Sequence, residues 1–198
     1  MSSKTPNTQD RILSAALKLL EGNPHKEVRM SDIAKRAGIS RQAVYLHFPT
    51  RAELLVATTK YLDDISNVDA RFAQSRAAKT GLERLDAFID AWGGYIPVTY
   101  GVAKALLAMK DTDEAADLAW KNRMQAVRER CAAAIKALNN DGLVDPRYTT
   151  EQATDILWTL LSVRNWEQFT QDCDWAQEHY IETMKTMARQ TLLSAQQV

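Results

Sequence analysis

The apolar residues of this chain recur at intervals of three and four positions along almost its whole length. Ile12, Ala16 and Leu19, for example, share one side of a helix that we expect at about 8–21. The alternation typical of strands is missing, and the chain has only seven glycines. This pattern predicts an all-α protein, because a periodicity near 3.6 buries one face of a helix and cannot bury one face of a strand.

Glycine, proline and capping residues place the ends of the other expected helices. Gly22 and Pro24 end the first one, and Pro49 with Thr50 separates two later ones. We predict further helices at about 31–37, 41–48, from 51 into the seventies, between 81 and 97, at 102–109, 113–138, 150–169 and 174–194.

Charge is divided unevenly along a chain whose formal net charge is zero. Residues 1–60 contain ten Lys and Arg against five Asp and Glu, a surplus of five positive charges. The remaining residues contain fifteen against twenty, a surplus of five negative charges. This asymmetry favours an N-terminal part that faces phosphates and a C-terminal part with another task.

The residues that usually carry catalysis or hold metals are sparse and scattered. Cys131 and Cys173 match no metal or redox spacing, and we expect both to be small buried hydrophobes in a reducing cytoplasm. The three histidines, His25, His47 and His179, form no motif with a cysteine or a carboxylate. We therefore expect no enzyme, no metal and no cofactor. The polar start and the lack of a long apolar run predict a cytoplasmic protein that does not enter a membrane.

Residues 28–51, VRMSDIAKRAGISRQAVYLHFPTR, have the layout of a helix-turn-helix. Two short helices are joined at Gly38, which supplies the left-handed residue that closes the first of them, and Ser40 can cap the second. In such a motif the second helix enters the major groove of DNA. We therefore predict an N-terminal three-helix head that binds DNA.

A rotation of about 100° per residue separates the second helix of this motif into two faces. Val44 and Phe48 point to the other helices of the head, whereas Gln42 and Leu46 point to the opposite side. Glutamine pairs with adenine, arginine pairs with guanine, and small apolar groups contact the thymine methyl. We expect contacts to base edges from Arg41, Gln42, Ala43 and Leu46, and contacts to phosphates from Arg29, Ser31, Ser40, Tyr45, His47 and Arg51.

The same segment resembles the DNA-binding domain of the TetR family of transcriptional repressors. The matching positions are Ile33, Ala34, Ala37, Gly38, Ile39, Ser40, Tyr45, His47, Phe48, Arg51, Leu54 and Leu55. The chain departs from the pattern at Arg29 and Met30, where the family usually has Thr or Ser, so we expect capping by Ser31 instead. The resemblance implies a DNA-binding domain at 1–50 and a helical ligand-binding and dimerisation domain at 51–198, in a homodimer that binds a palindromic operator.

The C-terminal part of the family houses a pocket for a small molecule. The aromatic and methionine side chains that are candidates to line it here are Trp92, Tyr95, Tyr100, Met109, Trp120, Met124 and Trp158. At helical spacing each one alone is more often an ordinary core residue, so the prediction concerns the group. Arg123 is better explained as a solvated charge than as a ligand contact.

The expected helix at 150–169 is apolar on more than one side, so it needs partners on two sides. By the resemblance, this helix and the last one pair with their copies in a four-helix dimer interface. The expected interface residues are Leu157, Leu161, Ile181, Met184, Ala188 and Leu192. The alternative is a helix that lies at the centre of a monomer.

These observations favour a ligand-responsive repressor that a small apolar or aromatic molecule releases from its operator. The alternative is a DNA-binding regulator whose C-terminal part docks a partner protein instead. An enzyme would need residues that only folding brings together, and the sequence gives no reason to expect them.

Overall fold

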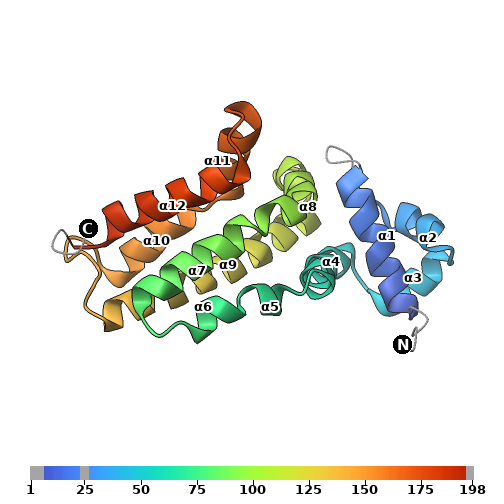
Figure 1. Cartoon of the computed structure of the whole chain (residues 1–198). Helices are drawn as coiled ribbons and strands as arrows, with labels where there is room; N and C mark the ends of the chain where they lie inside the picture. The colour runs from blue at the N-terminus through green and yellow to red at the C-terminus, as the bar shows by residue number, and fades with distance from the viewer. Residues whose placement is uncertain (1–6, 23–26, 195–198) are drawn as a thin grey trace, which may run out of the picture. The chain divides into compact units, whose positions relative to one another are not determined.

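The computed structural model describes residues 7–22 and 27–194, and it confirms an all-α protein (Figure 1). In the described residues, the only pairing of extended backbone is an isolated antiparallel bridge between Val144 and Leu193. The elements are α1 (Thr8–Gly22), α2 (Met30–Ala37), α3 (Arg41–His47), α4 (Arg51–Ile65), α5 (Val68–Arg71), α6 (Ala73–Ala77), α7 (Gly81–Gly93), α8 (Ile96–Met109), α9 (Glu114–Asn140), α10 (Thr150–Leu160), α11 (Val163–Glu167), the π-helix η1 (Gln168–Asp172) and α12 (Gln177–Leu192). Among the described residues, no helix has the length and apolar content needed to cross a bilayer.

The chain divides into two compact units. Of the described residues, the N-terminal unit comprises 7–22, 27–66 and 99–124, and the C-terminal unit comprises 67–98 and 125–194. Helices α8 and α9 therefore contribute residues to both units. The predicted boundary between residues 50 and 51 separates a DNA-binding domain from a ligand-binding domain. The division into compact units does not test which task each part of the chain has, so this boundary stays a prediction.

The N-terminal unit is built around α1, which packs on α2 and α4, while α2 packs on α3 (Figure 1). Ile12, Leu20, Ile33, Val44 and Leu54 are completely buried at the centre of these contacts. Apolar residues of α8 and of the first turns of α9 belong to the same core. Burial of side chains from all these helices fixes α3 against its neighbours.

The C-terminal unit is built around α7 and α12, which pack on each other, with α6 on α7 and α10 on α12. The indole nitrogen of Trp92 donates a hydrogen bond of 2.8 Å to the carbonyl of Leu161. Ion pairs of Arg189 with Asp86 and of Lys185 with Asp90 join α12 to α7 at the surface. Buried apolar contacts hold this unit together, and the partly exposed ion pairs add little to its stability.

The expected continuous helix at 150–169 is interrupted, because local hydrogen bonds replace the helical ones. α10 ends at Leu160, and the hydroxyl of Ser162 caps α11 by accepting from the Asn165 N–H at 3.2 Å. The Asn165 side chain in turn donates to the carbonyl of Thr159 at 2.8 Å. The helix expected from residue 51 into the seventies is also broken, at Asn67, whose φ of 51° is left-handed.

The two cysteines differ in their surroundings. Cys131 is completely buried, and burial raises the pKa of its thiol to about 12. Cys173 is exposed after the π-helix. The prediction of a small buried hydrophobe therefore holds for Cys131 and is wrong for Cys173, which lies in the connection between η1 and α12.

Gly81 begins α7 at a point where α9 passes very close. A Cβ atom at position 81 would lie 2.6 Å from the Cα and the backbone nitrogen of Leu138. Backbone atoms cannot rotate away, so we expect Gly81→Ala to lower the free energy of unfolding by about 3 kcal/mol. Urea denaturation followed by circular dichroism measures this change. Gly22, with open space around it, provides the control: Gly22→Ala is expected to change stability by less than about 1 kcal/mol. Equal stabilities of the two variants would contradict the close approach.

Candidate nucleic-acid interface

The turn between α2 and α3 is fixed by backbone geometry and by one side chain of α1. Gly38 has φ 68° and ψ 37°, a left-handed conformation that glycine adopts without strain. Its N–H and that of Ile39 bond back to carbonyls of the last turn of α2, with Ile39 to Ala34 at 3.1 Å. The Arg11 guanidinium donates to the carbonyl of Ala37 at 2.6 Å. The angle between the two helices is thereby set.

Helix α3 begins and faces inward as the sequence predicts. The hydroxyl of Ser40 accepts a hydrogen bond of 3.1 Å from the Ala43 N–H, so Ser40 is the N-cap. Val44 is 0% exposed and Phe48 is 5% exposed. These contacts leave the opposite side of α3 free of any packing role in the N-terminal unit.

The outward side of α3 presents side chains of mixed chemistry. Arg41, Gln42, Tyr45, Leu46 and His47 are all exposed, and Leu46 reaches 81% exposure. Such a highly exposed apolar side chain buries almost no surface within its own unit, so packing in that unit does not explain its presence. The surface therefore offers hydrogen-bond donors, acceptors and one apolar group on a single short helix, which suits a groove about 12 Å wide.

Arg41 and Tyr45 are held together on this surface, one turn apart. The Arg41 guanidinium donates to the Tyr45 hydroxyl at 3.3 Å, and its Cζ lies 5.5 Å from the centre of the tyrosine ring. The hydrogen bond to Tyr45 raises the pKa of Arg41 above its ordinary value. The pair presents a cation and a phenol in one fixed arrangement.

The start of α2 differs from the expectation in one detail. Arg29 occupies the N-cap position without a side-chain capping bond, and Ser31 lies inside the helix. The expected capping by Ser31 is therefore wrong, because α2 begins one residue earlier, at Met30. Both side chains are exposed, and Arg29 lies 3.5 Å from the exposed carboxylate of Glu27.

Arg51 is engaged inside the N-terminal unit. Its Nε donates to the carbonyl of Val28 at 2.6 Å, and Nη1 lies 2.6 Å from the Asp113 carboxylate. The two charged side chains are only 16% and 14% exposed. The expected contact of Arg51 with a phosphate would require this ion pair to open, so the structure offers Arg51 as a link between α4, α9 and the residues before α2.

The seven residues expected to line a ligand pocket are spread over both units. Tyr100, Met109, Trp120 and Met124 belong to the N-terminal unit, and Trp92, Tyr95 and Trp158 to the C-terminal unit. Met109, Trp92 and Tyr95 are buried among core residues, and Tyr100, Trp120, Met124 and Trp158 are half-buried. Of the seven, Trp120 borders a cavity of about 10 Å³ in the N-terminal unit, which is room for a single water molecule.

Arg123 is not the solvated charge that the sequence suggested. It is 9% exposed and forms an ion pair with Asp63 of α4. The pair lies within the N-terminal unit, so Arg123 contributes to the packing of α9 on α4.

The residues expected at a dimer interface lie mostly inside the protomer. Five of the six are at most 1% exposed: Leu157, Leu161, Met184, Ala188 and Leu192. The sixth, Ile181, is half-buried against Gly93. These apolar positions pack within the C-terminal unit of one protomer, so they offer little surface to a second copy, and the interface residues stay a prediction.

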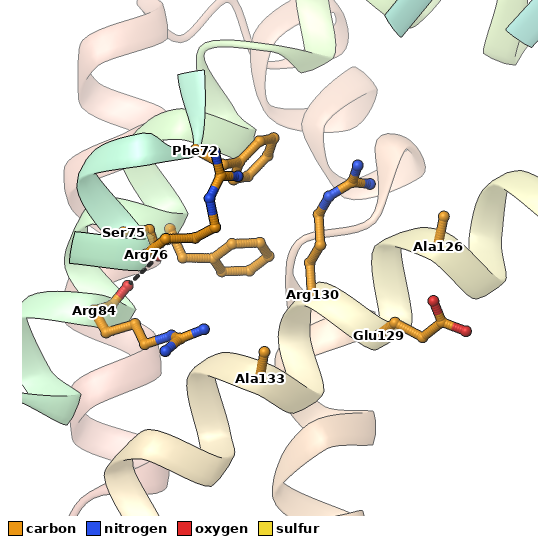
Figure 2. A pocket seen from close by; sticks show the side chains of 9 residues that line it. Phe72, Ser75, Arg76, Arg84, Ala126, Glu129, Arg130 and Ala133 are labelled. Atoms are coloured by element: carbon orange, nitrogen blue, oxygen red, sulfur yellow. Dashed lines mark hydrogen bonds between the residues drawn. The ribbon is translucent and has the colours of Figure 1, made fainter. Parts of the chain in front are cut away.

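A cavity of about 300 Å³ in the C-terminal unit was not anticipated (Figure 2). It lies between α6, α7 and α9, and its lining includes Phe72, Phe88 and three arginines. The sequence contains one signal for it: Ala126, Arg130 and Ala133 recur at helical spacing, with small residues on either side of a charged one.

Comparisons with known proteins agree with this geometry. Residues 12–58 match the family model for bacterial regulatory proteins of the tetR family. The HTH-type transcriptional regulator CymR of Pseudomonas putida is 26% identical over 163 residues, which cover 81% of this chain and 77% of CymR. The HTH-type transcriptional regulator EthR of Mycobacterium tuberculosis is 30% identical over 146 residues, 69% of this chain and 65% of EthR, slightly less than two thirds of its length.

Solved structures share this fold along nearly the whole chain. One of them is a transcriptional regulator from Saccharomonospora viridis in complex with choline, with a TM-score of 0.71 at 16% identity. The match covers 94% of this chain and 97% of that chain. At this identity the similarity shows a shared fold.

Proposed function

The chain belongs to the TetR family of transcriptional regulators, and on this premise we propose that it is a repressor that binds a palindromic operator as a homodimer and leaves it when a small molecule binds. The proposal places the protein in the cytoplasm, where its DNA is, and gives it no catalytic step.

The outward side of α3 is the observation that carries this proposal. Gln42 and Leu46 lie on the side opposite Val44, and Arg41 and Tyr45 are joined beside them. A helix that enters the major groove needs base contacts at its centre and phosphate contacts at its margins. The exposed side chains of α3 meet both needs, and its buried side chains hold it in place.

A second copy of the chain is needed because one short helix contacts only one half-site. Two heads reach successive major grooves when they lie about 34–36 Å apart. Since five of the expected interface residues are buried, we propose the other sides of α10 and α12 as the interface. Ile156, Trp158 and Leu160 are half-buried there, and Met187 is 39% exposed.

Release by a small molecule requires a ligand that binds one conformation of the body better than the other, because only differential affinity shifts an equilibrium. The S. viridis regulator of similar fold was solved with a bound small molecule, choline. The cavity of about 300 Å³ in the C-terminal unit has the size of a small-molecule site. Both observations favour a small molecule over a partner protein as the signal.

Selection of bound duplexes from a random DNA pool, followed by an electrophoretic shift assay, tests the proposal. We expect a palindromic consensus, and an affinity that falls steeply with salt, since each phosphate contact releases counterions. Light scattering on the eluted protein is expected to give the mass of a dimer. A chain that shifts no DNA at low salt, or that remains a monomer on its operator, would contradict the proposal.

A further inference from the structure

The cavity between α6, α7 and α9 has an aromatic floor. Phe72 and Phe88 are 4% and 2% exposed, and their ring centres lie 5.8 Å apart at an interplanar angle of 35°. Ser75 lies beside them, and its hydroxyl is already used in a hydrogen bond of 3.0 Å to the carbonyl of Arg84. The base of the cavity is therefore apolar, with no polar group there that needs a ligand.

Helix α9 leaves room above this floor because it carries small side chains there. Ala126 and Ala133 lie four residues before and three residues after Arg130, on the same side of the helix. Longer side chains at these two positions would fill the space. The cavity is thus a consequence of where α9 has alanine.

The opening of the cavity is positively charged. Arg76, Arg84 and Arg130 line it together with a single carboxylate, that of Glu129, which leaves a surplus of two positive charges. Figure 2 shows the Arg84 side chain extending toward Ala133 of α9, and the Glu129 carboxylate pointing away from Arg84. A cationic ligand is disfavoured by this balance, and an anion is favoured.

The three arginines differ in what they already bind. Arg76 donates to the carbonyl of Asp69 at 2.5 Å and lies 3.8 Å from its carboxylate. The Arg130 guanidinium lies over the Phe72 ring, 5.2 Å from its centre. Within residues 7–22 and 27–194, the guanidinium groups of Arg84 and Arg130 form no ion pair with a carboxylate. Two arginines at one cavity therefore keep their capacity for an anionic partner.

We propose that this cavity binds a small organic carboxylate with an aromatic body, and that this ligand is the effector of the regulator. Arg84 and Arg130 bond the carboxylate, and the aromatic body lies against Phe72 and Phe88. The expected effect of the ligand on DNA rests on the proposed function. The expected binding of the ligand rests on the cavity alone.

The chemistry of the lining selects this class over other anions. Guanidinium groups bond carboxylates in a planar, bidentate geometry. An inorganic anion would satisfy the arginines but would make no apolar contact with the aromatic floor. A volume of about 300 Å³ is at the lower end for ligand pockets, so the ligand is small.

Isothermal titration of the full-length protein without DNA tests the binding. The probes are benzoate, phenylacetate and 2-naphthoate, with benzamide as the neutral counterpart and inorganic phosphate as the anion without an aromatic body. We expect at least one of the carboxylates to bind at least about tenfold more tightly than benzamide and phosphate, because only it meets both parts of the site. No binding by any carboxylate, or equal binding of phosphate, would overturn the inference.

Two kinds of variant test the location. Arg84→Gln with Arg130→Gln removes the charge, and Ala133→Met fills the space; each is expected to weaken binding at least about tenfold. Arg164→Gln is the control, an exposed arginine in the same unit away from the cavity. Thermal unfolding shows whether each variant is folded. Folded variants of both kinds that bind as tightly as the wild type would place the ligand elsewhere.

The effect on DNA is measured separately from the binding. The same carboxylate is added to the protein–operator complex in an electrophoretic shift assay, and we expect the complex to dissociate in the wild type and to persist in the charge variant. A carboxylate that binds in the cavity and leaves DNA affinity unchanged would overturn its role as effector. A protein that binds carboxylates and shifts no DNA would contradict the proposed function and leave the cavity assignment standing.

Discussion

A chain with Gln42→Ala and Tyr45→Ala is expected to fold normally and to bind its operator about a thousandfold more weakly. Both side chains are exposed on α3 and contribute little to the core. A base contact or a phosphate contact is worth on the order of 1 kcal/mol or more, and a dimer loses each of them twice. The loss of about 4 kcal/mol corresponds to roughly three orders of magnitude in Kd.

Salt dependence and a matched control decide how this loss arises. Gln42 and Tyr45 are neutral, so the slope of log K against log salt is expected to stay unchanged, whereas Arg41→Ala is expected to reduce it by about one per subunit. Gln74→Ala, an exposed glutamine on α6, is the control for loss of a surface amide. An operator affinity within about threefold of the wild type, in a folded double variant, would show that α3 does not enter the groove.

Arg51→Ala is expected to lower the free energy of unfolding by about 3 kcal/mol. The change removes the ion pair with Asp113 and the hydrogen bond to the Val28 carbonyl, and it leaves a largely buried carboxylate without its partner. Asp113→Asn is expected to have a similar effect. In the structure, the Asp113 carboxylate accepts a hydrogen bond of 3.0 Å from the Ala115 N–H. The amide oxygen of the variant can accept the same hydrogen bond, so the N-terminus of α9 keeps its cap.

The double variant separates an internal role from a phosphate contact. If Arg51 acts through Asp113, the Arg51→Ala, Asp113→Asn chain loses clearly less stability than the sum of the single changes. If Arg51 binds phosphate, Arg51→Ala reduces the salt slope, and Asp113→Asn strengthens DNA binding because it removes the carboxylate that competes with the phosphate. Lys60→Ala, an exposed lysine on the same helix, is the control and is expected to change stability by less than about 0.5 kcal/mol.

Helix-forming segments and the two faces of α3 were predictable because they depend on local chemistry. The Ser40 cap, the left-handed Gly38 and the inward Val44 follow from residue type and from a spacing of 3.6 residues per turn. Breaks inside long helices were missed where one side chain competes with the backbone. Asn165 bonds the carbonyl of Thr159, and no periodicity of apolar residues contains that information.

The sequence by itself determined the all-α fold, the helix-turn-helix and the family, because periodicity, capping and turn residues act over short distances. The tertiary structure alone decided which neighbours each side chain meets. It pairs Arg51 with Asp113, 62 residues away, buries Leu157 and Met184 within one protomer, and brings Arg84 and Arg130 to one cavity. The physical reason is that the spacing of apolar and charged residues along a helix is the same whichever element the helix packs against. Only the packing of the folded chain selects the side chains that each residue contacts.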